Sequence, residues 1–216
     1  MDSFIRGFNK WLCRVPCGIP WLLHLDQCKW IHSKSNFNIS GYLGAHVAAV
    51  AVWERFKGQR SERHSDSPIV ETRDLRQPWQ FMGLAGVYDI VDHLAHEEKR
   101  GVASLSCMTP ANGTLPQSLE AMSPVRLFRQ VLEEHDKASF HDMLPEKFTL
   151  MCSRGDIVVP PDTSWAFHGV LLPLLSEQRC RILSFESLKH RDFLHLDGSL
   201  PESIRLRDHI LHSLHQ

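Results

Sequence analysis

The sequence predicts a three-layer α/β fold in which helices cover both faces of a mostly parallel central sheet. Short apolar segments alternate with longer amphipathic segments along the chain, which is the pattern of strand–helix–strand units. Glycine-containing or polar turns follow several of the apolar segments, and no internal repeat is present. The 216 residues suffice for one domain with a sizeable core but are few for a complete layered architecture of this kind.

The first elements follow in the order that such a fold requires. Residues 26–35 have a helical apolar pattern, and residues 37–39 read as a short strand that ends in a turn at Gly41. Residues 44–53 are almost wholly apolar and small, which is typical of a helix packed closely against a sheet. Residues 57–77 are charged and aperiodic, and they are predicted to form an exposed insertion.

The second half continues the alternation. Residues 79–88 indicate a buried strand that runs into a glycine-marked turn, and residues 89–100 indicate a helix. Ser123 and Pro124 are the expected cap and first-turn residues of another helix. The remaining predicted elements are a strand at 148–152, a helix at 163–175, a strand at 180–185 and a helix at 201–214.

Charge and cysteine usage narrow the classes of partner. Lys and Arg number 24 against 25 Asp and Glu, a net charge of −1 that excludes a basic surface for nucleic acid. The six cysteines show neither a C-x-x-C pair nor zinc spacing, so we expect reduced thiols, no metal and no other cofactor. The cysteine usage favours an intracellular protein, in the cytoplasm or at the face of an internal membrane, and the near-zero net charge favours a neutral partner.

Residues 1–25 are expected to form a distinct N-terminal segment ahead of a domain at 26–216. They mix basic residues with tryptophan, phenylalanine and proline, but no apolar run is long enough to span a membrane. This composition suits peripheral membrane contact, and it equally suits packing against the domain.

Three motifs place candidate catalytic groups in the chain order nucleophile, acid, histidine. Tyr42 lies at the apex of a turn between Ser40 and Gly44, whose small side chains suit the steric demands of a nucleophile elbow. Asp156 follows one predicted strand and His190 follows the next, so both are expected at the carboxyl edge of the parallel sheet. There Asp156 would orient the imidazole and His190 would transfer a proton.

Each motif alone has an ordinary structural explanation, as a glycine turn, a turn carboxylate and one of fourteen histidines. Their order and context favour a common site instead. Ser40 is a poor substitute nucleophile, because it lies two positions before the apex, where a strand side chain points into the sheet.

The chain resembles the α/β-hydrolase superfamily, and within it the isoprenylcysteine methylesterases and related carboxylesterases. The resemblance runs from about residue 30 to the C-terminus and rests on residues 41–46, 86–89, 91–93, 123–124, 155–160 and 190–194. It implies an α/β-hydrolase-like fold that is shortened at its N-terminal side. It also implies a serine esterase that cleaves carboxylic esters, with the methyl ester of a prenylated cysteine as one candidate substrate.

Two departures from the family pattern lead us to expect weak or absent hydrolysis. Tyr42 replaces the serine, and a rigid phenol with a pKa of about 10 is a bulky and misplaced nucleophile. No H-G-G stretch precedes the elbow, which leaves the backbone N–H of Leu43 as the candidate oxyanion donor.

Two alternatives remain open at this point. The chain could be a binding or regulatory module that holds an apolar or ester ligand in the old acyl pocket. Trp53, Phe81 and Tyr88 would line that pocket, unless they belong to the core. The less favoured alternative is a nucleophilic Tyr42 activated by His190. The sequence shows no counterpart of the strands that precede the elbow in the family, which would leave one edge of the sheet exposed. Either residues 1–25 cover this edge, or the chain is a truncated or misassembled version of a longer esterase.

Overall fold

A computed structural model describes residues 31–32, 37–41, 43–63, 80–133, 144–193 and 200–214. In this part of the chain, five strands form one sheet in the order β1-β2-β3-β4-β5, with β1 antiparallel to β2 and the remaining neighbours parallel. The strands are β1 (Ile31–His32), β2 (Phe37–Gly41), β3 (Gln80–Leu84), β4 (Lys147–Ser153) and β5 (Cys180–Phe185). The predicted mostly parallel sheet is thereby confirmed.

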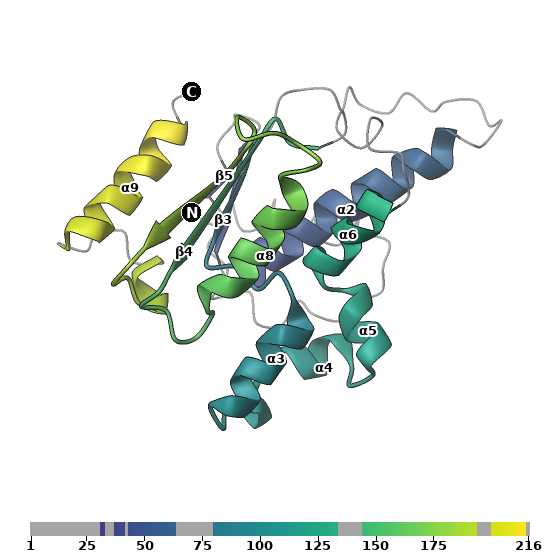
Figure 1. Cartoon of the computed structure of the whole chain (residues 1–216), viewed down its shortest axis with the longest axis horizontal. Helices are drawn as coiled ribbons and strands as arrows, with labels where there is room; N and C mark the ends of the chain where they lie inside the picture. Colours follow the sequence, from purple (N-terminus) through teal and green to yellow (C-terminus); the bar gives the residue numbers. More distant parts are fainter. Residues whose placement is uncertain are drawn as a thin grey trace, which may run out of the picture.

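Helices cover both faces of this sheet, as predicted (Figure 1). Helices α2, α6 and α8 pack on one face and α9 packs on the other. Right-handed crossovers between sequential parallel strands place their helices on a common face, which accounts for the first three. The helices are α2 (Leu43–Arg63), α3 (Ile90–Lys99), η2 (Ala103–Leu105), α4 (Met108–Asn112), α5 (Pro116–Ala121), α6 (Pro124–Glu133), α8 (Pro161–Leu171), η3 (His190–Phe193) and α9 (Pro201–Leu214).

Two sequence-based expectations require correction near the first strands. Ile31 and His32 form β1, paired with Ile39 and Asn38 of β2, where the apolar pattern predicted a helix. Antiparallel pairing with β2 supplies partners for the backbone of these residues and overrides the side-chain pattern. The other residues of the expected helix, 26–30 and 33–35, lie outside the described residues.

The buried helix α2 is longer than predicted and continues to Arg63. It therefore enters the segment expected as an exposed insertion, of which residues 64–77 lie outside the described residues. Good helix formers in this stretch, and an exposed ion pair of 2.9 Å between Glu54 and Lys57 at i, i+3, favour the continuation. Residues 1–25 also lie outside the described part, so the division of the chain into domains remains a prediction.

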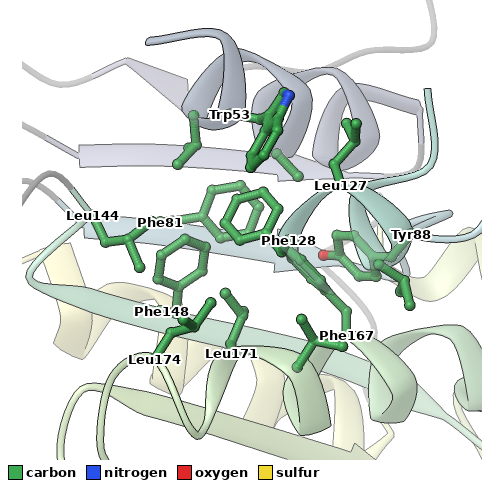
Figure 2. Close-up of a cluster of buried hydrophobic side chains, with 14 of the residues drawn as sticks. Trp53, Phe81, Tyr88, Leu127, Phe128, Leu144, Phe148, Phe167, Leu171 and Leu174 are labelled. Carbon is green, nitrogen blue, oxygen red and sulfur yellow. The ribbon is translucent and has the colours of Figure 1, made fainter. Parts of the chain in front are cut away.

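The larger core lies between the sheet and helices α2, α6 and α8, and it is dominated by aromatic rings (Figure 2). Tyr88 stacks on Phe167 with ring centroids 4.6 Å apart, and Trp53 lies 5.8 Å from Phe128. Trp53, Phe81 and Tyr88 are at most 6% exposed. These three side chains are thus core residues, and they do not line an open pocket.

The second core lies on the opposite face of the sheet, beneath α9. Successive strand residues point to opposite faces, so Phe81 belongs to the first core and Met82 to the second. Phe193 of η3 packs here, with its ring centroid 6.1 Å from that of Phe185 in β5. This contact fixes η3, which begins at His190, against the end of the sheet.

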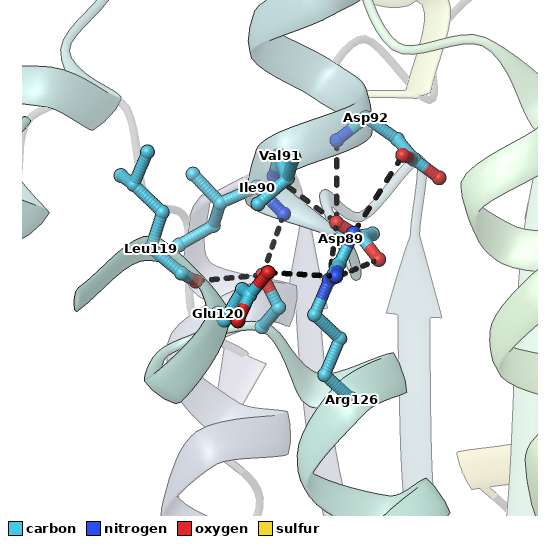
Figure 3. A network of polar contacts seen from close by, with 8 residues as sticks. Asp89, Ile90, Val91, Asp92, Leu119, Glu120 and Arg126 are labelled. Atoms are coloured by element: carbon cyan, nitrogen blue, oxygen red, sulfur yellow. Dashed lines mark hydrogen bonds and ion pairs between the residues drawn. The ribbon is translucent and has the colours of Figure 1, made fainter. Parts of the chain in front are cut away.

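Helices α3, α4 and α5, with η2, form a helical cap at residues 90–121, between β3 and α6 (Figure 1). A polar network ties this cap to α6 (Figure 3). Asp89 caps α3 by accepting from the backbone N–H of Val91 at 3.0 Å and of Asp92 at 3.2 Å. Arg126 of α6 donates from Nε to both Asp89 oxygens, at 3.0 and 3.3 Å, and contacts Glu120 of α5.

Ser123 lies directly before α6 as predicted, and its carbonyl accepts from Leu127 N at 3.0 Å. Helix α6 begins at Pro124 as expected, but the Ser123 hydroxyl accepts from Ile90 N at 2.9 Å and donates to Leu119 O at 2.8 Å. The hydroxyl thus joins the first residue of α3 to α5.

No helix in the described part of the chain is long and apolar enough to cross a membrane.

Candidate active site

The structure brings Asp156 and His190 together at the carboxyl edge of the sheet. Asp156 follows β4 and His190 begins η3 after β5, so two adjacent parallel strands end beside each other. His190 Nδ1 lies 2.7 Å from Asp156 Oδ2, and because a carboxylate only accepts, Nδ1 carries the proton. The Asp156 side chain is fully buried, whereas that of His190 is 23% exposed.

The second oxygen of Asp156 is held by its own loop. Oδ1 accepts from the backbone N–H of Val158 at 2.9 Å and of Val159 at 3.0 Å. A buried carboxylate is costly unless it is paired and hydrogen-bonded, and these contacts, with that of His190, meet the requirement. The carboxylate is therefore held in one orientation, with Oδ2 facing the imidazole.

Gly155 allows the loop of Asp156, residues 154–160, to touch the loop that leads to His190. A Cβ atom at position 155 would lie 2.8 Å from the carbonyl carbon of Ser187 and 3.0 Å from the carbonyl oxygen of Leu188. Real Cβ atoms essentially never approach backbone this closely, so any larger residue would push the two loops apart. Glycine is needed here for this close backbone approach.

The candidate nucleophile position, Tyr42, lies outside the described residues. Leu43, the candidate oxyanion residue, is the first residue of α2, so its N–H has no partner within the helix. Its partly buried side chain packs on the same apolar cluster as Val158 and Val159 of the Asp156 loop. The start of α2 and this loop therefore converge on one cluster, to which the cap also contributes Ile90.

Two buried histidines that were not predicted as site residues lie near this edge. His46 of α2 donates from Nδ1 to the carbonyl of Val87 at 2.8 Å, and burial lowers its pKa to about 4. Burial also lowers the pKa of His93 in α3, where the charge of Glu97 opposes the shift and that of His190 adds to it. The signal in the sequence for His46 was its placement within an otherwise apolar segment.

The inward face of α3 carries three polar side chains. His93, His96 and Glu97 share this face because residues three and four positions apart on a helix are neighbours. His93 Nε2 lies 3.4 Å from Glu97 Oε1, and His96 Nε2 donates to the carbonyl of Ile157 at 2.9 Å. Helix α3 therefore contacts the loop directly beside Asp156.

The described cysteines and acidic clusters offer no second reactive centre. Burial raises the pKa of Cys152 to about 11 and that of Cys180 to about 12, so neither thiol is ionised at neutral pH. Within residues 31–32, 37–41, 43–63, 80–133, 144–193 and 200–214, no group of three His, Cys, Asp or Glu side chains could hold a metal ion.

Comparisons with known proteins give a likeness of fold. No protein-family model and no curated protein sequence matches the chain. Esterase B from Lactobacillus rhamnosis matches with a TM-score of 0.51 and 14% identity, over 80% of this chain and 50% of the esterase. Puromycin hydrolase matches with a TM-score of 0.44 and 14% identity, over 73% of this chain and 20% of the hydrolase. The acylaminoacyl peptidase of Pyrococcus horikoshii matches at 0.46 and 16%, over 79% and 21% of the two chains.

The esterase match supports the fold predicted from the sequence. Together with the parallel sheet and its helices on both faces, it identifies an α/β-hydrolase fold. The chain spans half of the length of this esterase.

Proposed function

We propose that this protein is a carboxylesterase-type α/β hydrolase whose ester hydrolysis is weak or absent, because Tyr42 occupies the nucleophile position. The observation that carries the proposal is the hydrogen bond of 2.7 Å between His190 Nδ1 and the buried carboxylate of Asp156. A histidine oriented in this way is the proton-transfer unit of serine hydrolases.

In the proposed site, the roles follow from the contacts of each residue. Asp156 holds His190 in the tautomer with hydrogen on Nδ1, so Nε2 is the atom that would accept and return a proton. The N–H of Leu43, at the start of α2, would donate to the developing oxyanion. A phenol at position 42 would offer this base a bulky group that is seldom ionised at neutral pH, since its ordinary pKa is about 10.

Apolar side chains beside this edge favour an ester with an apolar substituent. Several partly buried hydrophobic residues surround the cluster on which the Asp156 loop packs, and Ile157 is 69% exposed. These partly buried residues are Leu43, Val91, Leu94, Met122 and Val158. The methyl ester of a prenylated cysteine remains a candidate substrate on this basis. The intracellular location and the membrane contact of residues 1–25 also remain predictions.

Kinetics of Tyr42→Ser with a short acyl nitrophenyl ester test the proposal. We expect no saturable cleavage by the unmodified protein and at least a roughly tenfold gain in kcat/KM on restoring the serine. The gain should vanish in Tyr42→Ser/His190→Ala and persist in Tyr42→Ser/His209→Ala, since His209 is an exposed residue of α9. Saturable cleavage by the unmodified protein that His190→Ala abolishes would contradict weak hydrolysis, and a folded but inert Tyr42→Ser would contradict the hydrolase site itself.

The second candidate function is a module that binds an apolar or ester ligand without cleaving it. The partly exposed apolar residues beside the Asp156 loop favour it, although Trp53, Phe81 and Tyr88 do not contribute. A ligand that binds only the folded state must raise thermal stability, so prenyl and acyl compounds should increase the melting temperature. The absence of any shift would contradict this candidate. Labelling with a fluorophosphonate, followed by mass spectrometry, separately reports whether Tyr42 is nucleophilic.

A further inference from the structure

The loop that carries Asp156 is joined to α3 by a hydrogen bond from His96, in addition to the hydrogen bonds within the loop. Val158 and Val159 donate to Asp156, and Asp156 N donates to Ser153 O at 3.3 Å, so these bonds close within the loop and the end of β4. His96 Nε2 instead joins Ile157, the residue directly after Asp156, to a separate element. This hydrogen bond fixes the loop relative to the helical cap.

The His96 hydrogen bond joins Ile157 itself to a separate element. The Ile157 side chain is 69% exposed, so burial of apolar surface contributes little to its placement. The next two residues pack on the apolar cluster that includes Ile90 of the helical cap: Val158 is partly buried, and Val159 is 4% exposed. The loop is therefore bound to the helical cap just after Asp156, by the His96 hydrogen bond and by the packing of Val158 and Val159.

Helix α3 is itself held in place, so His96 has a fixed position from which to donate. Asp89 caps its first turn, Arg126 fixes Asp89, and Ser123 accepts from Ile90 N (Figure 3). Because the carbonyl of Ile157 only accepts, the hydrogen in this contact lies on His96 Nε2.

We propose that His96 is a positioning residue of the site, which fixes the carbonyl of Ile157 and thereby the orientation of Asp156 toward His190. The inference deepens the proposed function and rests on it, because it takes the Asp156–His190 pair as the group that transfers the proton. The helical cap then belongs to the machinery that aligns the pair, because displacement of α3 would release the peptide next to the carboxylate.

A pair of variants separates hydrogen bonding from packing at position 96. His96→Leu removes the donor, whereas His96→Gln places an amide nitrogen the same number of bonds from Cα as Nε2 and can restore it. His209→Leu, at an exposed position of α9, is the matched control. The readouts are amide hydrogen exchange at Val158 and Val159, whose N–H groups donate to Asp156, and the low-field proton resonance of His190 Nδ1–H.

We expect exchange at these two amides to be roughly threefold to tenfold faster in folded His96→Leu, as loss of one net hydrogen bond implies. The His190 resonance should broaden or disappear in the same variant, return in His96→Gln and persist in His209→Leu. Unchanged exchange and an unchanged resonance in His96→Leu would overturn the proposal. A His96→Gln variant that behaves like His96→Leu would overturn it as well.

The proposed function and the role of His96 can fail separately. Absence of the His190 resonance in the unmodified folded protein would contradict the acid–histidine pair, while exchange at Val158 and Val159 would still decide whether His96 holds the loop. Conversely, an inert Tyr42→Ser variant would refute the hydrolase proposal without altering those exchange rates.

Discussion

The protein should lose stability in mild acid because His46 must stay neutral when folded. His46 is 5% exposed, and its Nδ1–H donates to the carbonyl of Val87. Burial is the main cause that lowers its pKa from 6.5 to about 4. In the unfolded chain the same imidazole binds a proton near pH 6.5, so acid favours the unfolded state.

The size of the effect follows from the two pKa values. The stability that the neutral His46 contributes is fully present above pH 6.5 and declines as the pH falls below that value. The loss is complete once the pH is below about 4. At ~1.4 kcal/mol per pKa unit, the loss in free energy of unfolding is about 2 kcal/mol at pH 5 and about 3 kcal/mol at pH 4.

Urea denaturation of the unmodified protein and of His46→Asn, from pH 7 to pH 4.5, measures this term. The asparagine amide lies the same number of bonds from Cα as Nδ1, so it can donate to Val87 but does not titrate. His93, whose charge adds to the lowering of the His46 pKa, is present in both proteins. The stability of the unmodified protein relative to His46→Asn should fall by about 2 kcal/mol between pH 7 and pH 5. A difference that stays constant across this range would refute the burial of a neutral His46.

Three further predictions concern packing. Gly83→Ala should cost about 1–3 kcal/mol in urea denaturation, because its Cβ would overlap the Tyr88 hydroxyl, and Tyr88→Phe should recover part of that cost in the double variant; additive losses would contradict the contact. Gly155→Ala should broaden the NMR resonance of His190 Nδ1–H, since its Cβ would lie 2.8 Å from the carbonyl carbon of Ser187 and push the two loops apart; an unchanged resonance would contradict the close contact of these loops. Arg126→Met should cost about 1 kcal/mol in chemical denaturation, because it removes the donor that both oxygens of Asp89 accept from, and Arg126→Lys should cost less, because it keeps a cation that can donate to Asp89; equal losses would contradict this.

The sequence was informative wherever the signal was local. Apolar segments followed by turns located the parallel strands, and the residues that follow β4 and β5 were therefore expected at one edge of the sheet. Asp156 and His190 could be paired from the sequence because topology alone brings the carboxyl ends of adjacent parallel strands together. Their catalytic roles, and that of Leu43, remain proposals.

Features that depend on which segments pair or pack together could not be predicted. The pairing of Ile31 with Ile39 overrode a local helical pattern, and the hydroxyl of Ser123 found partners in α3 and α5. The contact of His96 with Ile157 joins residues 61 positions apart, and no spacing in the sequence relates them. Likewise, Gly155 looks like an ordinary turn glycine until the backbone of Ser187 is seen beside it.

The acid–histidine pair fits the proposed chemistry, and the packing of the core does not depend on it. The aromatic core lies around Phe128 and Phe167, and it includes neither member of the pair. Burying the Asp156 carboxylate opposes folding, and replacing buried ion pairs with apolar side chains of similar volume is often neutral or stabilising. A fold selected for stability alone therefore has no need of this carboxylate. Two backbone donors and a close approach at Gly155 nevertheless hold it toward His190, and the proposed role of His96 would add to them; this is the arrangement that the proposed proton transfer requires.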